Sequence, residues 1–280
     1  MGSVFEKGLL AGKVAYVAGG TRGMNLAIAK RYAEFGAKVA VMSRNPERVE
    51  KARAEISQMG GDALGFAVDA RDYDAVADSM KATADAFGGL DLVVAGQAGN
   101  FYAPALGMSA KGFKTIIDID LNGTYHVFRA CFEHLRRPGA SLLAITAPEA
   151  VRPLHFQAHV CAAKAGVNQL LRVLALEWGP AGVRVNGISP GPIEGSWGMK
   201  NVAAPTQDIV DRITRAIPLK RWGKESDVAD AALFLASPAA SYITGTILEV
   251  DGGVTIASPE GNQDTVGDLT ADVRVKRDES

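Results

Sequence analysis

The chain has 280 residues, of which 48% are hydrophobic and 22% are charged, close to the average for a globular protein. These values exclude a wholly disordered chain and a fibrous one. Lys and Arg number 30 against 31 Asp and Glu, so the net charge of −1 offers no strong field to attract nucleic acid or an anionic membrane.

Short β-branched runs alternate with longer segments of helical periodicity along the chain. Strands are predicted at 13–18, 38–43, 63–69, 91–95, 141–146, 183–188 and 246–250. Helices are predicted to end near 35 and to span about 46–59, 73–87, 109–135, 156–178 and 227–236. Asn45, Asp72 and Ser109 are expected to begin three of these helices.

This alternation predicts βαβ units, and the nearly continuous apolar strands predict a sheet that is covered on both faces. The expected fold is α/β, with one doubly wound domain over 1–257 built on a seven-stranded parallel sheet. The variable segment at about 194–217 is expected to be a substrate lid, and 258–280 a polar tail. Neither a secretory signal nor a membrane span is apparent, and two cysteines cannot build a disulfide framework, so we expect a cytoplasmic protein.

A glycine-rich turn follows the first predicted strand. Residues 18–25 read AGGTRGMN and open a helix, so the glycines allow a tight turn while the helix N-terminus offers free N–H groups to an anion. The arrangement predicts binding of a dinucleotide pyrophosphate. Asn25 stands at the position of the motif's third glycine, and asparagine tolerates a left-handed backbone better than most residues.

The second predicted strand ends in Ser43 and Arg44. An acidic residue there would hold the ribose hydroxyls of NAD, whereas a hydroxyl and a guanidinium, with Arg22 in the turn, suit the 2′-phosphate of NADP. The sequence therefore predicts NADP(H) as the cofactor. The alternative is that Arg44 is a solvated surface charge.

These features resemble the short-chain dehydrogenase/reductase family. The resemblance extends over about 8–255 and includes Val68-Asp69, Lys164, the NGISPGPI segment at 186–193, FLAS at 234–237 and VDGG at 250–253. It implies a Rossmann-type fold in which Asp69 contacts adenine, Lys164 the nicotinamide ribose and Pro192-Ile193 the carboxamide. The cofactor-binding residues expected in all are Gly19, Thr21, Arg22, Gly23, Met24, Ser43, Arg44, Asp69, Ala70, Ala95, Lys164, Pro190, Gly191, Pro192 and Ile193.

The chain departs from the family at the active site, which usually combines Asn, Ser, Tyr and Lys. Asp120 stands at the Asn position, Ala147 at the Ser position and Val160 at the Tyr position, so only Lys164 remains. A tyrosine in this family donates the proton when a carbonyl becomes an alcohol. Because valine has no proton to give, ordinary ketone reduction through that tyrosine is excluded.

Other polar side chains lie near these positions in the sequence. His159 precedes Lys164 by five residues, which places it about 140° around an ideal helix, so we expect it to face away from the lysine. His155 and His159 have the spacing of two metal ligands, but a third ligand is not apparent and no metal is expected. Glu149 lies at the rim where catalytic residues sit, or is a solvated loop charge.

A narrower resemblance is to the 2,4-dienoyl-CoA reductases of the peroxisomal type, which also lack the tyrosine. The segments that carry it are 97–101 (QAGNF), 113–120 (FKTIIDID), 176–180 (LEWGP) and 190–193 (PGPI). It implies NADPH and an acyl-CoA substrate, a conjugated dienoyl thioester. Cofactor or acyl-CoA contacts are expected at Arg44, Arg71, Phe101 and Ser109, and substrate contacts at Glu149 and Lys200, although Arg71 has the alternative of a local pair with Asp72.

The resulting expectation is an NADPH-dependent reductase of an activated C=C bond, a 2,4-dienoyl-CoA above all. Asp120 is expected to order a water or relay the proton beside Lys164, and Asn122 is a competing donor or a structural amide. Two alternatives stay open, namely reduction of another polarised bond and a catalytically silent NADP-binding protein. The family resemblance also implies a homotetramer.

Overall fold

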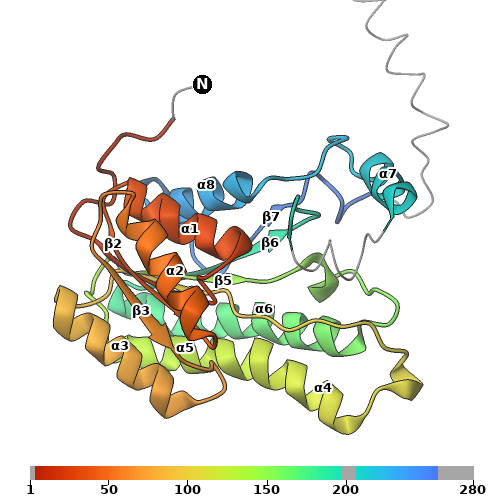
Figure 1. Ribbon diagram of the computed structural model, residues 1–280, viewed down its shortest axis with the longest axis horizontal. Coiled ribbons are helices and arrows are strands. Elements are labelled where there is room, and N and C mark those ends of the chain that lie inside the picture. The colour runs from red at the N-terminus through yellow and green to blue at the C-terminus, as the bar shows by residue number, and fades with distance from the viewer. Residues whose placement is uncertain (1–3, 197–205, 258–280) are drawn as a thin grey trace, which may run out of the picture.

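Seven parallel strands form the centre of the protein in the computed structural model, which describes residues 4–196 and 206–257 (Figure 1). Their order in the sheet is β3-β2-β1-β4-β5-β6-β7, as expected for a doubly wound Rossmann-type fold. The strands are β1 (Val14–Ala18), β2 (Lys38–Ser43), β3 (Ala63–Ala67), β4 (Leu92–Ala95), β5 (Ser141–Ile145), β6 (Arg184–Pro190) and β7 (Ile247–Val250). All seven predicted strands are therefore confirmed, with ends that differ by one or two residues.

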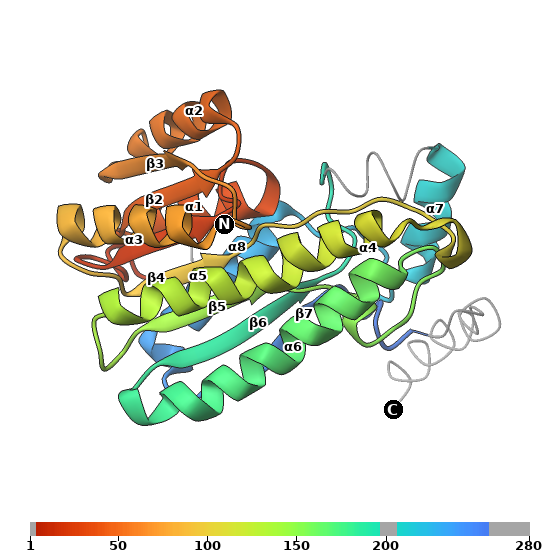
Figure 2. The ribbon, with the colours of Figure 1, turned by 90° about the horizontal axis from the view of Figure 1, so that it is seen from below.

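Helices cover both faces of this sheet (Figure 2). One face carries α1 (Gly23–Glu34), α2 (Pro46–Ser57) and α8 (Glu225–Ala236). The other carries α3 (Tyr73–Phe87), α5 (Gly123–Cys131) and α6 (Ala158–Trp178). The helices α4 (Ala110–Ile116) and α7 (Gln207–Ala216) both lie toward the right-hand end of the molecule in Figure 1, α7 at the top and α4 at the bottom.

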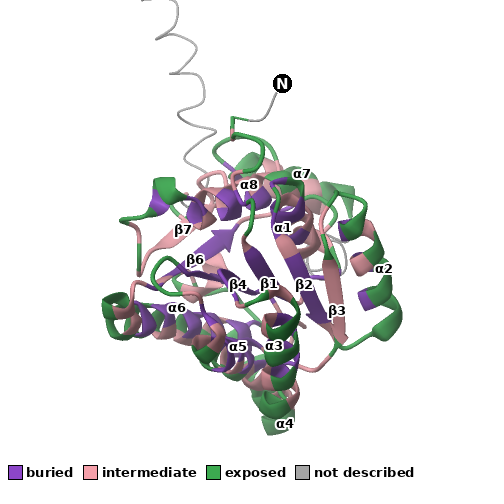
Figure 3. Ribbon diagram, turned by 90° about the vertical axis from the view of Figure 1, so that its left-hand side faces the viewer, coloured by how far each residue is buried: buried purple, intermediate pink, exposed green. Residues whose placement is uncertain are grey.

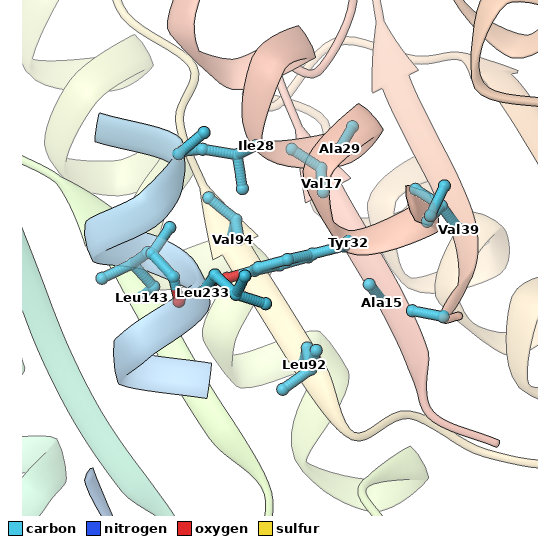
Figure 4. Close-up of a cluster of buried hydrophobic side chains, with 14 of the residues drawn as sticks. Ala15, Val17, Ile28, Ala29, Tyr32, Val39, Leu92, Val94, Leu143 and Leu233 are labelled. Atoms are coloured by element: carbon cyan, nitrogen blue, oxygen red, sulfur yellow. Dashed lines mark hydrogen bonds between the residues drawn. The ribbon is translucent and has the colours of Figure 1, made fainter. Parts of the chain in front are cut away.

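Alternation along the strands produces the two hydrophobic layers. In β1, Ala15 and Val17 point into the layer under α1 and α8, whereas Tyr16 points into the layer under α3 and α5. Tyr32 of α1 crosses the first layer, and its hydroxyl donates a hydrogen bond to the Ala232 carbonyl of α8 (Figure 4). The central strands are buried on both faces, which explains why their sequences are nearly continuously apolar (Figure 3).

The long helix predicted at 109–135 is not continuous. It begins as α4, widens into a π-helical segment at Ile117–Asn122, continues as α5 and ends in a 3-10 turn at Phe132–His134. A π-helical segment inserts an additional residue into the turn, which hydrophobic periodicity does not report. Here it accompanies the burial of Asp120 in the middle of an otherwise apolar helix face.

Three of the predicted helix starts are confirmed. The side chains of Asn45, Asp72 and Ser109 each accept a backbone N–H at the start of their helices, as predicted. The segment predicted as a lid contains α7, a helix that was not foreseen. Its residues 197–205, including Lys200, and the tail at 258–280 lie outside the described residues. Within the described part of the chain, none of the helices combines the length and apolarity that a membrane crossing requires.

Candidate active site

The turn after β1 lies where the strand order reverses, between β1 and β4. In open α/β sheets, ligands bind at this point, outside the carboxyl ends of the strands. Gly19 in the turn has a φ of +70°, and a Cβ there would lie 2.8 Å from the backbone nitrogen of Gln97. Only glycine fits this position, because both the backbone conformation and the approach of the β4 loop exclude a side chain.

Asn25 has a structural role that the sequence did not reveal. It lies within α1 and is not among the residues with positive φ, so the expectation that it tolerates a left-handed backbone is wrong. Its amide Nδ2 instead donates a hydrogen bond of 2.6 Å to the carbonyl of Gly96, the residue that follows β4. Asn25 thus connects the start of α1 to the next strand at the reversal point.

A group of arginines lies beside the glycine-rich turn. Burial lowers the pKa of Arg22, and the positive charges of Arg48 and then Arg44 lower it further. A cavity of about 320 Å³ lies at this place and is lined by Thr21, Arg22, Gly23, Leu26, Arg48, Lys51 and Glu55. Arg48 was missed in the sequence, although its position four residues after Arg44 and in the first turn of α2 is a usable signal. This cluster provides three positive charges for an anion.

Asp69 and Arg71 lie past the end of β3 and form a two-pronged ion pair. Arg71 Nη2 is 2.6 Å from Asp69 Oδ2, and Arg71 Nε is 3.0 Å from Asp69 Oδ1. The Arg71 guanidinium holds the pKa of the Asp69 carboxyl below its ordinary value. The local partner of Arg71 is therefore Asp69 rather than Asp72, whose carboxylate caps α3.

The other predicted cofactor residues line the same edge of the sheet. Gly191 packs so closely on Asp251 that a Cβ would lie 2.6 Å from the Asp251 Cα, and Pro192 accepts a hydrogen bond from Gly223. Met24 packs on the core under α1, and Thr21, Ala70, Ala95 and Ile193 are buried. Ser43 and Pro190 are the last residues of their strands.

A buried carboxylate and a buried lysine form the centre of the site. Asp120 is fully buried in the π-helical segment, and its Oδ1 accepts a hydrogen bond of 2.8 Å from the Gly99 amide. Its Oδ2 lies 3.3 Å from Nζ of Lys164 on α6. Lys164 Nζ also donates to the Ile145 carbonyl at the end of β5. The pair joins two helices and two strand ends. The sequence predicted that both residues belong to the reacting centre, but it did not predict the ion pair between them.

Apolar side chains occupy the places of the family's hydroxyls. Val160 is one turn before Lys164 on α6, is 5% exposed, and packs with Ile116 and Ala163. Ala147 follows β5 by two residues, beside Thr146, whose hydroxyl is used in a 2.6 Å hydrogen bond to Asn168. Hydroxyl chemistry is therefore not available at Val160 or Ala147.

His159 lies inside the site, contrary to the prediction from an ideal helical wheel. It is fully buried at the start of α6, and its ring centroid is 4.3 Å from that of Phe101. Burial lowers the pKa of His159, and the charge of Asp120 acts in the opposite direction. The helical-wheel argument failed because α6 contacts the π-helical segment on one side and β6 on another, so that more than one face of its first turns is covered.

The structure separates the remaining predicted residues from this centre. Asn122 is exposed, and its amide donates to Asp118 rather than toward Lys164. Ser109 caps α4. Glu149 lies in a 3-10 turn. Burial raises the pKa of Tyr102, and the negative charge of Glu149 raises it further, so Glu149 and Tyr102 are neighbours, which the sequence did not suggest.

The histidine pair does not form a metal site. His155 is exposed, whereas His159 is buried. Over the two described ranges, 4–196 and 206–257, groups of three or more His, Cys, Asp or Glu side chains that could hold a metal ion are absent.

Comparisons with known proteins give the family. A family profile described as Enoyl-(Acyl carrier protein) reductase matches residues 18–255. The peroxisomal 2,4-dienoyl-CoA reductase of Saccharomyces cerevisiae is 39% identical over 250 residues, covering 88% of this chain and 85% of that protein. The corresponding protein of Pongo abelii is 36% identical over 258 residues, covering 91% and 88%. A short-chain dehydrogenase/reductase structure from Serratia marcescens is 27% identical with a TM-score of 0.82, covering 88% and 99%.

The chain therefore belongs to the short-chain dehydrogenase/reductase family, and it is an oxidoreductase. Within this family it is similar to the 2,4-dienoyl-CoA reductases. Members of the family use nicotinamide cofactors, and the glycine-rich turn at the strand reversal is where such a dinucleotide is held.

Proposed function

We propose that the protein is an NADPH-dependent reductase of an activated C=C bond, with a 2,4-dienoyl-CoA thioester as its substrate. The observation that carries the proposal is the buried pair of Asp120 and Lys164, with the apolar Val160 one helix turn before the lysine. The two relatives above are named as 2,4-dienoyl-CoA reductases that produce a (3E)-enoyl-CoA. These names support the choice of substrate.

The residues near the glycine-rich turn fit NADP rather than NAD. Arg22, Arg44 and Arg48 lie close enough to one another for their charges to interact, and an acidic residue does not end β2. Such a cluster favours the dianionic 2′-phosphate and gives no advantage to a free ribose hydroxyl. The glycine-only conformation at Gly19 leaves the helix N-terminus open to the pyrophosphate.

The chemistry of a dienoyl thioester explains why the tyrosine is dispensable. Bound NADPH would supply a hydride to the far end of the conjugated diene. Negative charge then spreads to the thioester oxygen, so the site stabilises an enolate and protonates a carbon without forming an alkoxide. Asp120 and Lys164 hold and deliver that proton, through a water, to the carbon beside the thioester, and protonation there yields the (3E)-enoyl product.

The mouth of the site suits an acyl-CoA. Exposed apolar side chains come from the loop after β4 and from the loop after β5, and the two loops are joined by a hydrogen bond from the Ala103 amide to the Phe156 carbonyl. These side chains are Tyr102, Leu106, Val151, Leu154 and Phe156, and Phe113 of the adjoining helix α4 is a further exposed apolar residue. Arg71, although paired with Asp69, remains 43% exposed and can meet a CoA phosphate. Lys200, the other expected cation, is not among the described residues.

The test is NADPH oxidation, followed by absorbance, with 2,4-hexadienoyl-CoA as substrate. Asp120→Ala should reduce kcat by about 10²- to 10⁴-fold, the usual contribution of a positioned acid or base, while NADPH binds unchanged. Asp118→Ala is the matched control, because this carboxylate lies two residues away and pairs on the outer surface with Lys114 and Asn122. A wild-type protein that binds NADPH but leaves the dienoyl-CoA unreduced would overturn the proposal and favour another activated bond or a silent binding protein.

A further inference from the structure

Several buried polar side chains in the segments that contact the Asp120 region carry atoms that lack hydrogen-bond partners. Among the residues that the structure describes, they include Oε1 of Gln97, Oδ1 of Asn100, Oε1 of Gln157 and both ring nitrogens of His159. These side chains come from the loop after β4 and from the start of α6. An unsatisfied buried polar group is unfavourable, so several of them in neighbouring segments indicate a place where water or a ligand completes the hydrogen bonding.

His159 is the most demanding member of this group. It is fully buried, and the ring of Phe101 packs against it. Because burial lowers its pKa, its imidazole is neutral near neutral pH and needs one acceptor for its N–H and one donor for its other nitrogen. Within the described part of the chain, neither ring nitrogen makes an aligned hydrogen bond to a protein atom, although the backbone carbonyls of Phe101 and Gln157 lie close enough to act against the lowering of the pKa.

Asp120 provides the complementary acceptor. Its Oδ1 is held by the Gly99 amide, whereas its Oδ2 has the charge of Lys164 nearby but accepts no aligned hydrogen bond from any described residue. His159 is near enough to interact with the Asp120 charge, yet the two side chains do not hydrogen-bond directly. One buried water is stable where two to four polar partners surround it. Asp120 Oδ2 and a ring nitrogen of His159 provide two candidate partners.

We propose that His159 is a positioning residue for Asp120, linked to its Oδ2 through one bound water. The link orients the carboxylate beside Lys164 and gives a partner to Asp120 Oδ2 and to one ring nitrogen of His159. The kinetic consequence rests on the proposed function, because it assumes that Asp120 serves the proton transfer. The link itself is a property of the folded protein and can be measured without turnover.

The first experiment measures the link directly by 15N NMR of the imidazole nitrogens. The protein contains four histidines, so the His159 signals are identified by their loss in His159→Phe. We expect Asp120→Asn to shift the resonance of one His159 ring nitrogen, and Asp118→Asn, the surface control, to leave it in place. Asp120→Ser serves as a second variant if Asp120→Asn does not fold. His159 signals that are unchanged in a folded Asp120 variant would overturn the proposal.

The second experiment separates positioning from packing. His159→Phe keeps the ring against Phe101 but removes both nitrogens, and we expect kcat to fall by about 10- to 100-fold, as small misplacements of a catalytic group do, with little change in KM. His159→Asn and His159→Gln place an amide near one or the other ring nitrogen, so one of them should recover part of the loss. His155→Asn, at an exposed position four residues earlier, should leave kcat unchanged.

Coupling to Asp120 completes the test. If His159 acts through Asp120, His159→Phe should add almost no further loss in an Asp120→Asn background. Losses that multiply, or a fall in kcat that neither amide relieves, would show that His159 only fills space. If the wild type does not reduce a dienoyl-CoA but the NMR shift is present, the proposed function fails while the link between His159 and Asp120 stands.

Discussion

Arg22, Arg44 and Arg48 repel one another across the glycine-rich turn, and the lowered pKa of Arg22 reflects both burial and that repulsion. Such a cluster is costly in the free protein, because like charges lie close together at a partly buried site. A bound dianion removes this cost. At the scale of single residues, the arrangement therefore acts on cofactor choice more than on stability.

Arg44→Ala should weaken NADPH binding by about 10- to 100-fold, because a charge-assisted hydrogen bond contributes about 1.5–3 kcal/mol. NADH, which lacks the 2′-phosphate, should bind with unchanged affinity. Fluorescence titration with both cofactors measures the difference. Arg53→Ala on α2 is the control, since Arg53 is engaged by Glu50 on the surface. An equal loss of NADPH and NADH affinity in Arg44→Ala would contradict the assignment of the 2′-phosphate.

At the scale of elements, α6 and the π-helical segment form the site together. Lys164 of α6 contacts both the Ile145 carbonyl and Asp120. Val160, one turn earlier on the same helix, packs against Ile116 of α4. Leu121 fits against Gly166, where a Cβ would lie 2.9 Å from a Leu121 methyl group. The close approach of the two helices leaves little room for a larger side chain at Val160.

Val160→Tyr, which rebuilds the family's tyrosine and lysine spacing, should not create a ketone reductase. Tyrosine overfills the cluster around Ile116 and Ala163, and overpacking of this kind costs about 1–3 kcal/mol of unfolding free energy. Urea denaturation measures this loss, and Ala162→Tyr at the exposed neighbouring position is the control. A Val160→Tyr variant of full stability that reduces simple ketones would show that the missing hydroxyl, rather than the packing, is what sets the chemistry.

At the scale of the whole molecule, a buried carboxylate that stabilises the fold and the residues of the candidate active site lie at opposite edges of the sheet. Asp91, directly before β4, accepts hydrogen bonds from the Val14 amide, from Lys13 and from Arg136. Val14 begins β1, Lys13 directly precedes it and Arg136 lies before β5, so a single buried carboxylate joins the amino ends of three strands. The Asp120 and Lys164 pair lies at the carboxyl ends.

Asp91→Ala should lower the free energy of unfolding by about 1–3 kcal/mol, because it leaves a buried backbone N–H and two cations without their acceptor. The kcat of the folded enzyme should not change, since the site lies at the other edge. Urea unfolding and steady-state kinetics on the same preparation test both statements, with the exposed Asp78→Ala on α3 as the control. A large fall in kcat with normal stability would contradict this separation.

Hydrophobic periodicity and glycine spacing predicted the seven strands, the covered sheet and the glycine-rich turn, because these features depend on local backbone preference and on burial. The family resemblance also placed Asp120 beside Lys164. The same reasoning put His159 outside the site and treated Asn25 as a left-handed residue. Both errors come from contacts between segments far apart in sequence, His159 with Phe101 and Asn25 with Gly96.

The sequence by itself thus determined the fold and the presence of a valine, Val160, one helix turn before Lys164, since the order of strands and helices and the identity of each residue are written in it. Only the tertiary structure decided that a π-helical segment turns Asp120 onto Lys164, that Arg48 joins Arg22 and Arg44, and that Arg71 pairs with Asp69. The physical reason is that a buried charge is tolerated only beside its partner. That partner comes from another element, whose distance along the chain does not report its distance in space.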